Sequence, residues 1–138
     1  MTGTVSIITR DVNAQIILET LLRLRGLDVR VATDDVEPCE MLAREGVGVV
    51  VVDLSAPLRN GAELLRKLRP QPSVPGCAPT PRIVVLTDHE APEVERFAER
   101  LRADACMRKP LEPRRFIATV EGLLAGKLST RATGATRS

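Results

Sequence analysis

Two kinds of hydrophobic pattern alternate along the chain. Short apolar runs of three to seven residues, most of them rich in β-branched residues, are typical of buried strands, and we expect five of them, at residues 5–8, 29–32, 47–53, 83–87 and 105–107. Between these runs, apolar residues recur at spacings of three and four, which predicts amphipathic helices. The chain is therefore expected to alternate strand and helix from one end to the other.

The first predicted helix has Asn13 as its cap and should end at Gly26. Its expected apolar positions are Ala14, Ile17, Leu18, Leu21 and Leu22. Further helices are expected after Asp35, around Leu64–Leu68, over Val94–Leu101 and over Arg114–Leu124. Five prolines between positions 70 and 81 predict an extended linker before the fourth strand.

The third strand is apolar on both faces, because Val49 to Val52 are four consecutive valines that end at Asp53. Such a strand is typical of the centre of a parallel sheet with helices on each side. Five alternating strands and helices favour βαβ units with right-handed crossovers. We therefore expect an α/β protein of the flavodoxin-like, doubly wound (βα)5 class, with a five-stranded parallel sheet in the order 2-1-3-4-5.

Composition narrows the class of protein. A chain of 138 residues, 43% hydrophobic and 28% charged, predicts one globular domain over residues 1–126, followed by a basic, disordered tail over 127–138. The sequence has no apolar run long enough to span a membrane and no secretory signal, so we expect a cytoplasmic protein. Three cysteines without metal-ligand spacing predict neither a disulfide framework nor a zinc site. With a net charge of +2 and two aromatic residues, the chain has no stacking platform for nucleic acid.

Candidate chemistry lies where the predicted strands end. In parallel sheets ligands bind at the carboxyl ends of the strands, which here carry Thr9 and Arg10, Asp53, Thr87 and Lys109. A carboxylate, a hydroxyl and an ammonium at one edge form a constellation suited to handling a phosphoryl group. Asp53 would be the nucleophile, and Thr87 and Lys109 would hold phosphoryl oxygens.

From residue 5 to about residue 124, this arrangement resembles the receiver domain of two-component response regulators. The resemblance rests on Asp53 with the loop Leu54–Gly61 that follows it, on Thr87 at the end of a strand, and on the pair Lys109-Pro110. It implies a phosphoacceptor at Asp53, phosphoryl contacts from Thr87 and Lys109, and a cis peptide bond before Pro110. It also implies a two-state switch that is read out on the last helices and strand.

The chain departs from that family where a metal would bind. The resemblance places two adjacent acids that hold Mg²⁺ at the end of the first strand, where this chain has Thr9 and Arg10. Asp11 comes one residue late and would need a bulge to serve. Asp53 beside Arg10 and Lys109 gives a formal charge of about +1, against about −2 for the usual pocket, so a cation gains little there. We expect no metal; Asp53 and Asp11 would be the ligands if one bound.

Other positions modify the pocket or the switch. Asp88 follows Thr87 where the family has a small residue, and its carboxylate would repel a phosphate. Cys106 stands at the position of the family's switch aromatic, so rotation of an aromatic ring cannot be the readout. Arg102 replaces the glycine that follows the fourth helix. Ser55, two residues after Asp53, stands where a haloacid-dehalogenase-type phosphatase requires a second aspartate, which argues against that enzyme class.

The reading that we favour is an atypical, single-domain receiver that signals through protein contacts without Mg²⁺-dependent phosphorylation, and that is not an enzyme. One alternative is a phosphorelay receiver that accepts a phosphoryl group on Asp53, with Mg²⁺ as cofactor. Another is a small-anion sensor that uses Arg10, Thr87 and Lys109. A cobalamin-binding module lacks its histidine motif between Arg10 and Gln15.

The expected partner is a protein, such as a histidine kinase or another signalling protein, bound through the face from Glu93 to Leu124. The sequence does not decide whether the protein forms a homodimer. Neither nucleic acid nor a membrane is expected as a partner. No cofactor is expected under the favoured reading.

Overall fold

The computed structural model describes residues 3–32, 47–54, 81–87, 96, 99–100 and 102–126. Five strands form one sheet: β1 (Thr4–Ile8), β2 (Asp28–Ala32), β3 (Val49–Asp53), β4 (Arg82–Thr87) and β5 (Ala105–Arg108). Two helices are described, α1 (Val12–Arg23) and α5 (Pro113–Leu124). All five predicted strands are present, and their bounds differ from the prediction by one or two residues.

The sheet is parallel throughout, with the order β2-β1-β3-β4-β5. The register sets Ile7 of β1 beside Val51 of β3, and Val51 beside Val84 of β4. Since all strands run the same way, their carboxyl ends meet at one edge of the sheet. The predicted flavodoxin-like fold class and strand order are confirmed.

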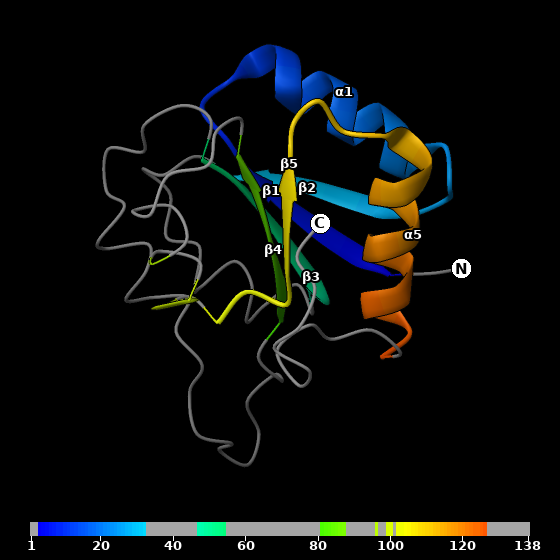
Figure 1. Ribbon diagram of the computed structural model, residues 1–138. Coiled ribbons are helices and arrows are strands. Elements are labelled where there is room, and N and C mark those ends of the chain that lie inside the picture. The colour runs from blue at the N-terminus through cyan, green and yellow to red at the C-terminus, as the bar shows by residue number, and fades with distance from the viewer. Residues whose placement is uncertain are drawn as a thin grey trace.

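Helices α1 and α5 lie together on one face of the sheet (Figure 1). Alternate strand residues point to this face and form a core with the helices. Phe116 of α5 and Leu22 of α1 are fully buried there against valines of β3. The intervening residues of β3, Val50 and Val52, point to the opposite face and are also completely buried. Burial on both faces explains why β3 reads as an unbroken apolar run.

The start of α1 differs from the expectation. Asp11, not Asn13, is the N-cap, because its Oδ1 accepts hydrogen bonds from the backbone nitrogens of Asn13 (2.9 Å) and Ala14 (3.2 Å). A short carboxylate before the first turn satisfies amide groups that the helix leaves without partners. At the other end Gly26 adopts a φ of 81°, which confirms the predicted stop.

The predicted apolar face of α1 is only partly correct. Leu18 and Leu22 are buried, and Ala14 and Leu21 are half-buried. Ile17 is 59% exposed, so it does not belong to the buried stripe of the helix. The buried stripe is therefore narrower than the run of apolar residues suggests.

Asp104 joins the two strands at the far edge of the sheet. Its carboxylate accepts a hydrogen bond from the backbone nitrogen of Ile83 at 2.9 Å and pairs with Arg82 Nη1 at 3.1 Å. The backbone nitrogen of Asp104 in turn donates to the carbonyl of Ile83 at 2.7 Å. These contacts align the starts of β4 and β5, and so place the residues at their other ends.

Several predictions lie outside the described residues. These are the second and third helices, the proline-rich linker, most of the fourth helix, the tail over 127–138, and the pocket positions Ser55 and Asp88. The boundary between domain and tail therefore stays a prediction. Within the described ranges, no helix has the combined length and apolar character that a bilayer-spanning segment requires.

Candidate functional site

The site is centred on Asp53, the last residue of β3, whose side chain is completely buried. Two donors reach the same carboxylate oxygen. Thr9 Oγ1 donates to Asp53 Oδ2 at 2.9 Å, and Lys109 Nζ lies 3.0 Å from that oxygen. A buried carboxylate needs both charge compensation and hydrogen bonds, and these two residues supply one of each.

Thr9 follows β1 directly and is only 4% exposed. Its hydroxyl has a second contact, because the backbone nitrogen of Asp11 donates to Thr9 Oγ1 at 3.1 Å. A position at which the resemblance implies a metal-binding acid thus carries a hydroxyl that donates to Asp53. The parallel register of β1 and β3 brings Thr9 and Asp53 together across adjacent strand ends.

Lys109 is held in place by its backbone. Its amide nitrogen donates to the carbonyl of Thr87 at 2.7 Å, and the Lys109-Pro110 peptide bond is cis, as the resemblance implied. Thr87 ends β4 and is 5% exposed, opposite Arg108 of β5. The structure therefore brings Thr9, Asp53, Thr87 and Lys109 to one edge of the sheet. The roles that the sequence suggested for them stay predictions.

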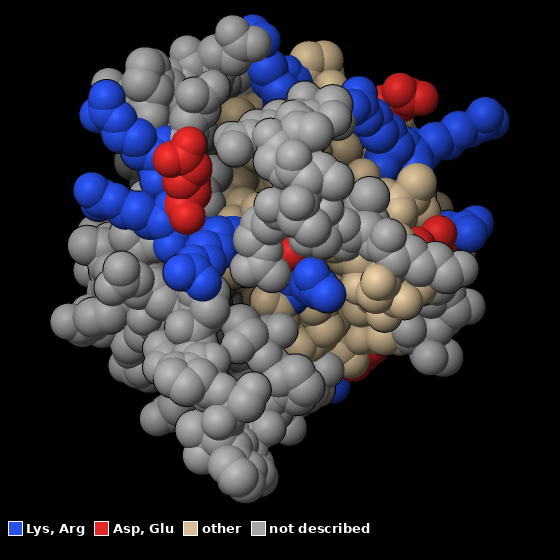
Figure 2. Space-filling model, turned by 60° about the horizontal axis from the view of Figure 1, so that its bottom comes forward, with Lys and Arg blue, Asp and Glu red and all other residues tan. Residues whose placement is uncertain are grey.

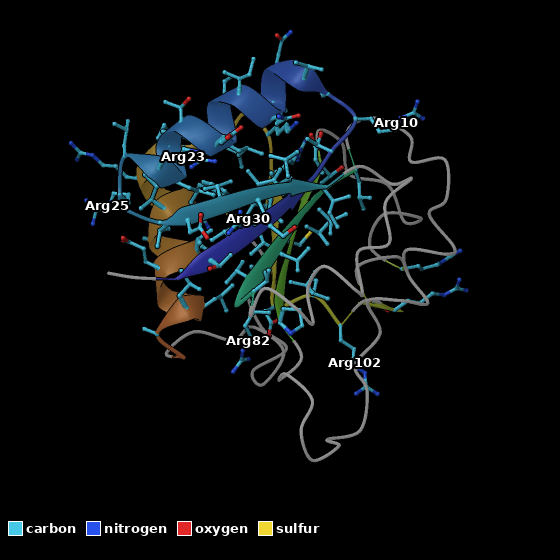
Figure 3. All side chains as sticks on the ribbon, turned by 180° about the vertical axis from the view of Figure 1, so that it is seen from behind. Arg10, Arg23, Arg25, Arg30, Arg82 and Arg102 are labelled. Carbon is cyan, nitrogen blue, oxygen red and sulfur yellow. The ribbon has the colours of Figure 1, made fainter. Side chains whose placement is uncertain are left out.

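Arg10 and Asp11 lie differently from the other candidates. Arg10 is exposed, and its side chain points away from the sheet beside the start of α1, at the opposite end of that helix from Arg23 and Arg25 (Figure 3). The side chain of Asp11 caps α1 through Oδ1. Asp11 therefore has a structural role as a helix cap. From the sequence, only a role as a substitute metal ligand was expected for it.

Cys106, which stands at the position of the family's switch aromatic, is half-buried in β5 opposite Val85 of β4. The position points to the opposite face from its neighbours Ala105 and Met107, which belong to the core packed under α1 and α5. A readout through Cys106 would therefore act on that opposite face.

The described residues at this edge do not fit a Mg²⁺ ion. Mg²⁺ requires several oxygen ligands in near-octahedral geometry. Here Asp53 Oδ2 already accepts from an ammonium and a hydroxyl, and a lysine this close repels a cation. Over the described parts of the chain, no group of three or more His, Cys, Asp and Glu side chains is placed to hold a metal ion.

The surface of the described residues combines paired charges with an apolar strip along α1. Exposed arginines lie beside acids, as in Arg23 with Glu19 at 3.0 Å and Arg25 with Glu121 at 3.2 Å. On the face that Figure 2 shows, Lys and Arg side chains form separate groups, some of them next to acidic side chains. Large exposed apolar side chains among the described residues all belong to α1 or the residue that follows it: Val12, Ile16, Ile17 and Leu24.

Sequence reasoning missed three of these features. The capping role of Asp11 had a signal, since an aspartate directly before an apolar helix is a common N-cap. The hydrogen bond from Thr9 to Asp53 joins residues 44 positions apart, and the one from the Ile83 amide to the Asp104 carboxylate joins residues 21 positions apart. Neither long-range contact has a local signature in the sequence.

Comparison with known proteins places the chain in a family. The sequence profile of the response regulator receiver domain matches residues 5–121. The chain belongs to the response regulator receiver domain family. The resemblance drawn from Asp53, Thr87 and Lys109-Pro110 is thereby confirmed, and with it a place in two-component signalling.

Curated relatives of this receiver domain are longer proteins. It is 30% identical over 115 residues to a CpxR homolog, a transcriptional regulatory protein of Haemophilus influenzae, covering 83% of this chain and 47% of that protein. It is 28% identical over 108 residues to the aerobic respiration control protein ArcA of Escherichia coli, covering 78% and 42%. The chain thus spans less than half the length of the curated relatives that it matches.

Solved structures give the same fold. A response regulator receiver protein from Burkholderia phymatum has a TM-score of 0.68 and 25% identity over 89% of this chain and 95% of that one. A response regulator from Chloroflexus aurantiacus has a TM-score of 0.72 and 23% identity, covering 91% and 99%. The receiver domain of a Saccharomyces cerevisiae response regulator, solved with a histidine phosphotransfer signalling protein, has a TM-score of 0.71 and 18% identity, covering 92% of each chain.

Proposed function

We propose that this receiver domain signals through protein contacts while Asp53 is held by Thr9 and Lys109, without Mg²⁺-dependent phosphorylation. The observation that carries the proposal is the convergence of both donors on Asp53 Oδ2, at 2.9 and 3.0 Å. With an ammonium and a hydroxyl as its partners, the carboxylate is stabilised in the buried site without a divalent cation.

The end of β1 supports the same conclusion. The position of one metal-binding acid carries Thr9, which donates to Asp53, and the next carries the exposed Arg10. Asp11, the nearest acid in the sequence, uses Oδ1 to cap α1. A cation at Asp53 would share a carboxylate that is already paired with Lys109, and neither Thr9 nor Arg10 would add a second carboxylate.

Protein contacts are the route for output that we propose. The face from Glu93 to Leu124 stays a candidate, and its described part includes exposed polar residues of α5 such as Arg114 and Arg115. The exposed apolar side chains of α1 add a second candidate surface, since apolar strips on soluble proteins mark interaction sites. We infer a non-enzymatic, cytoplasmic role with no cofactor, in which a histidine kinase or another signalling protein is the partner.

The experiment compares unfolding midpoints by circular dichroism in millimolar Mg²⁺ and in Na⁺ at matched ionic strength. A bound ligand stabilises the folded state, so a site for Mg²⁺ raises the midpoint. We expect no rise for the natural sequence and a rise for the double variant Thr9→Asp/Arg10→Asp, which restores two acids. A rise for the natural sequence that Asp53→Asn abolishes would contradict the proposal.

A phosphorelay receiver is the second candidate, because Asp53, Thr87 and Lys109 gather at one edge as that function requires. The similar yeast receiver, solved with a histidine phosphotransfer protein, makes such a protein the partner to expect in this case. Mg²⁺-dependent labelling of Asp53 distinguishes this function from the first. Under the first, Asp53→Asn leaves the affinity for a protein partner nearly unchanged.

A further inference from the structure

A chain of hydrogen bonds connects Asp53 to the first turn of α1. The backbone nitrogen of Asp11 donates to Thr9 Oγ1 at 3.1 Å, and Thr9 Oγ1 donates to Asp53 Oδ2 at 2.9 Å. Thr9 is 4% exposed and Asp53 is completely buried, so water does not compete strongly for either bond. These two hydrogen bonds therefore link Asp53 to Asp11, the residue that caps α1.

Both bonds of the Thr9 hydroxyl have a defined direction. A backbone amide can only donate, so the hydroxyl oxygen accepts from Asp11. A carboxylate can only accept, so the single hydroxyl proton must point to Asp53. Removal of the acceptor at position 53 leaves that proton without a partner, and rotation of the hydroxyl to find another one changes the bond to Asp11.

A change at Asp11 reaches the helix directly. The Asp11 side chain accepts from the backbone nitrogens of Asn13 and Ala14, which belong to the first turn of α1. The same turn begins the exposed apolar strip, with Val12 65% and Ile16 55% exposed. The cap and the strip are therefore parts of one short segment.

We propose that Thr9 is a positioning residue that couples the carboxylate of Asp53 to the N-terminal turn of α1, and thereby to the apolar strip on that helix. The inference rests on the proposed function in taking Asp53 as a carboxylate held by Thr9 and Lys109. It connects the site to α1, which lies outside the face from Glu93 to Leu124.

Asp53 Oδ2 is also the start of a second connection. Lys109 Nζ binds the same oxygen, and the Lys109 amide donates to the carbonyl of Thr87 at the end of β4. This second connection leads toward β5 and α5 and does not pass through Thr9. The two connections can therefore be separated by substitution, because Thr9→Val interrupts only the first.

The experiment measures backbone amide shifts by ¹H–¹⁵N NMR in four proteins: the natural sequence, Asp53→Ala, Thr9→Val, and the double variant. Valine matches the shape of threonine without a hydroxyl, and alanine at position 53 removes the acceptor. We expect Asp53→Ala to move the amides of Asp11, Asn13 and Ala14 in the natural background. In the Thr9→Val background the same substitution should move them at least several-fold less.

Two controls make the result specific. Thr9→Ser keeps the hydroxyl and should restore the effect of Asp53→Ala on the α1 amides. The amide of Lys109 should respond to Asp53→Ala in both backgrounds, since its connection does not use Thr9. If Thr9→Val does not fold, Thr9→Ala takes its place in the same comparison.

Equal movement of the α1 amides in the Thr9→Val and natural backgrounds would overturn the inference. So would the absence of any movement at Asp11 after Asp53→Ala in the natural background. Neither result bears on the Mg²⁺ test, which depends on cation binding at Asp53, so the two failures can be told apart.

Discussion

Lys109 Nζ lies 3.0 Å from Asp53 Oδ2, in a pair whose acid is completely buried and whose lysine side chain is 22% exposed. The two residues are 56 positions apart in the chain and come from the ends of β3 and β5. Their contact joins the carboxyl ends of β3 and β5. In the interior, such a pair adds little net stability compared with apolar residues, but loss of one partner is costly.

Lys109→Met should therefore destabilise the domain by about 3 kcal/mol, because it removes the ammonium that pairs with the buried Asp53 carboxylate. Urea unfolding monitored by circular dichroism measures the loss. The double variant Lys109→Met/Asp53→Asn is the control, and it should recover much of the loss because no buried charge remains. A single variant as stable as the natural sequence would show that the ion pair does not compensate Asp53.

The second prediction concerns the contribution of Asp104 to the free energy of unfolding. Asp104→Ala leaves the Ile83 amide and the Arg82 guanidinium without their acceptor, so we expect a loss of about 2 kcal/mol in the free energy of unfolding. Asp28→Ala is the matched control, since Asp28 pairs with Arg30 on the surface with both side chains about half exposed, and it should cost less than about 0.5 kcal/mol. Similar losses of unfolding free energy for the two variants would argue against a stabilising role for the contacts of Asp104 with Ile83 and Arg82.

Arg102 adopts a φ of 55° and is exposed. The resemblance implies a glycine at this position, and the structure shows that arginine adopts the left-handed conformation. Since a side chain in this conformation costs about 1 kcal/mol or more, Arg102→Gly should raise the free energy of unfolding by about 1 kcal/mol.

Alanine at position 102 separates the backbone effect from the loss of the side chain. Arg102→Ala has the same backbone cost as arginine and should leave the stability nearly unchanged. A gain with alanine equal to that with glycine would assign the effect to the charge instead of the conformation.

The fold was predictable because its signals are local. Four consecutive valines before Asp53 marked a strand buried on both faces, and the alternation of strands and helices then indicated the topology. The residues at the strand ends followed from this topology, since parallel strands bring their carboxyl ends to one edge. The sequence alone therefore predicts that Asp53, Thr87 and Lys109 lie together.

The partners of those residues were harder to predict. Thr9 was recognised as a departure from an acidic position, but its donation to Asp53 depends on the register of β1 against β3 and on the orientation of the hydroxyl. Arg10 and Lys109 were expected to face Asp53 alike. In the structure Lys109 Nζ lies 3.0 Å from Asp53 Oδ2, and Arg10 is exposed at the start of α1. The exposure of Ile17 was not predictable, because hydrophobic spacing does not tell which side of a wide apolar stripe contacts the sheet.

The most direct test of the central claim is the intact mass of the protein after incubation with a small-molecule phosphodonor, with and without Mg²⁺. Mass suits this chain, which has no Trp or Tyr to report binding by fluorescence. We predict no phosphoryl increment under either condition, and an unchanged mass for Asp53→Asn. An increment that requires Mg²⁺ and disappears in Asp53→Asn would contradict the account and identify a phosphorelay receiver.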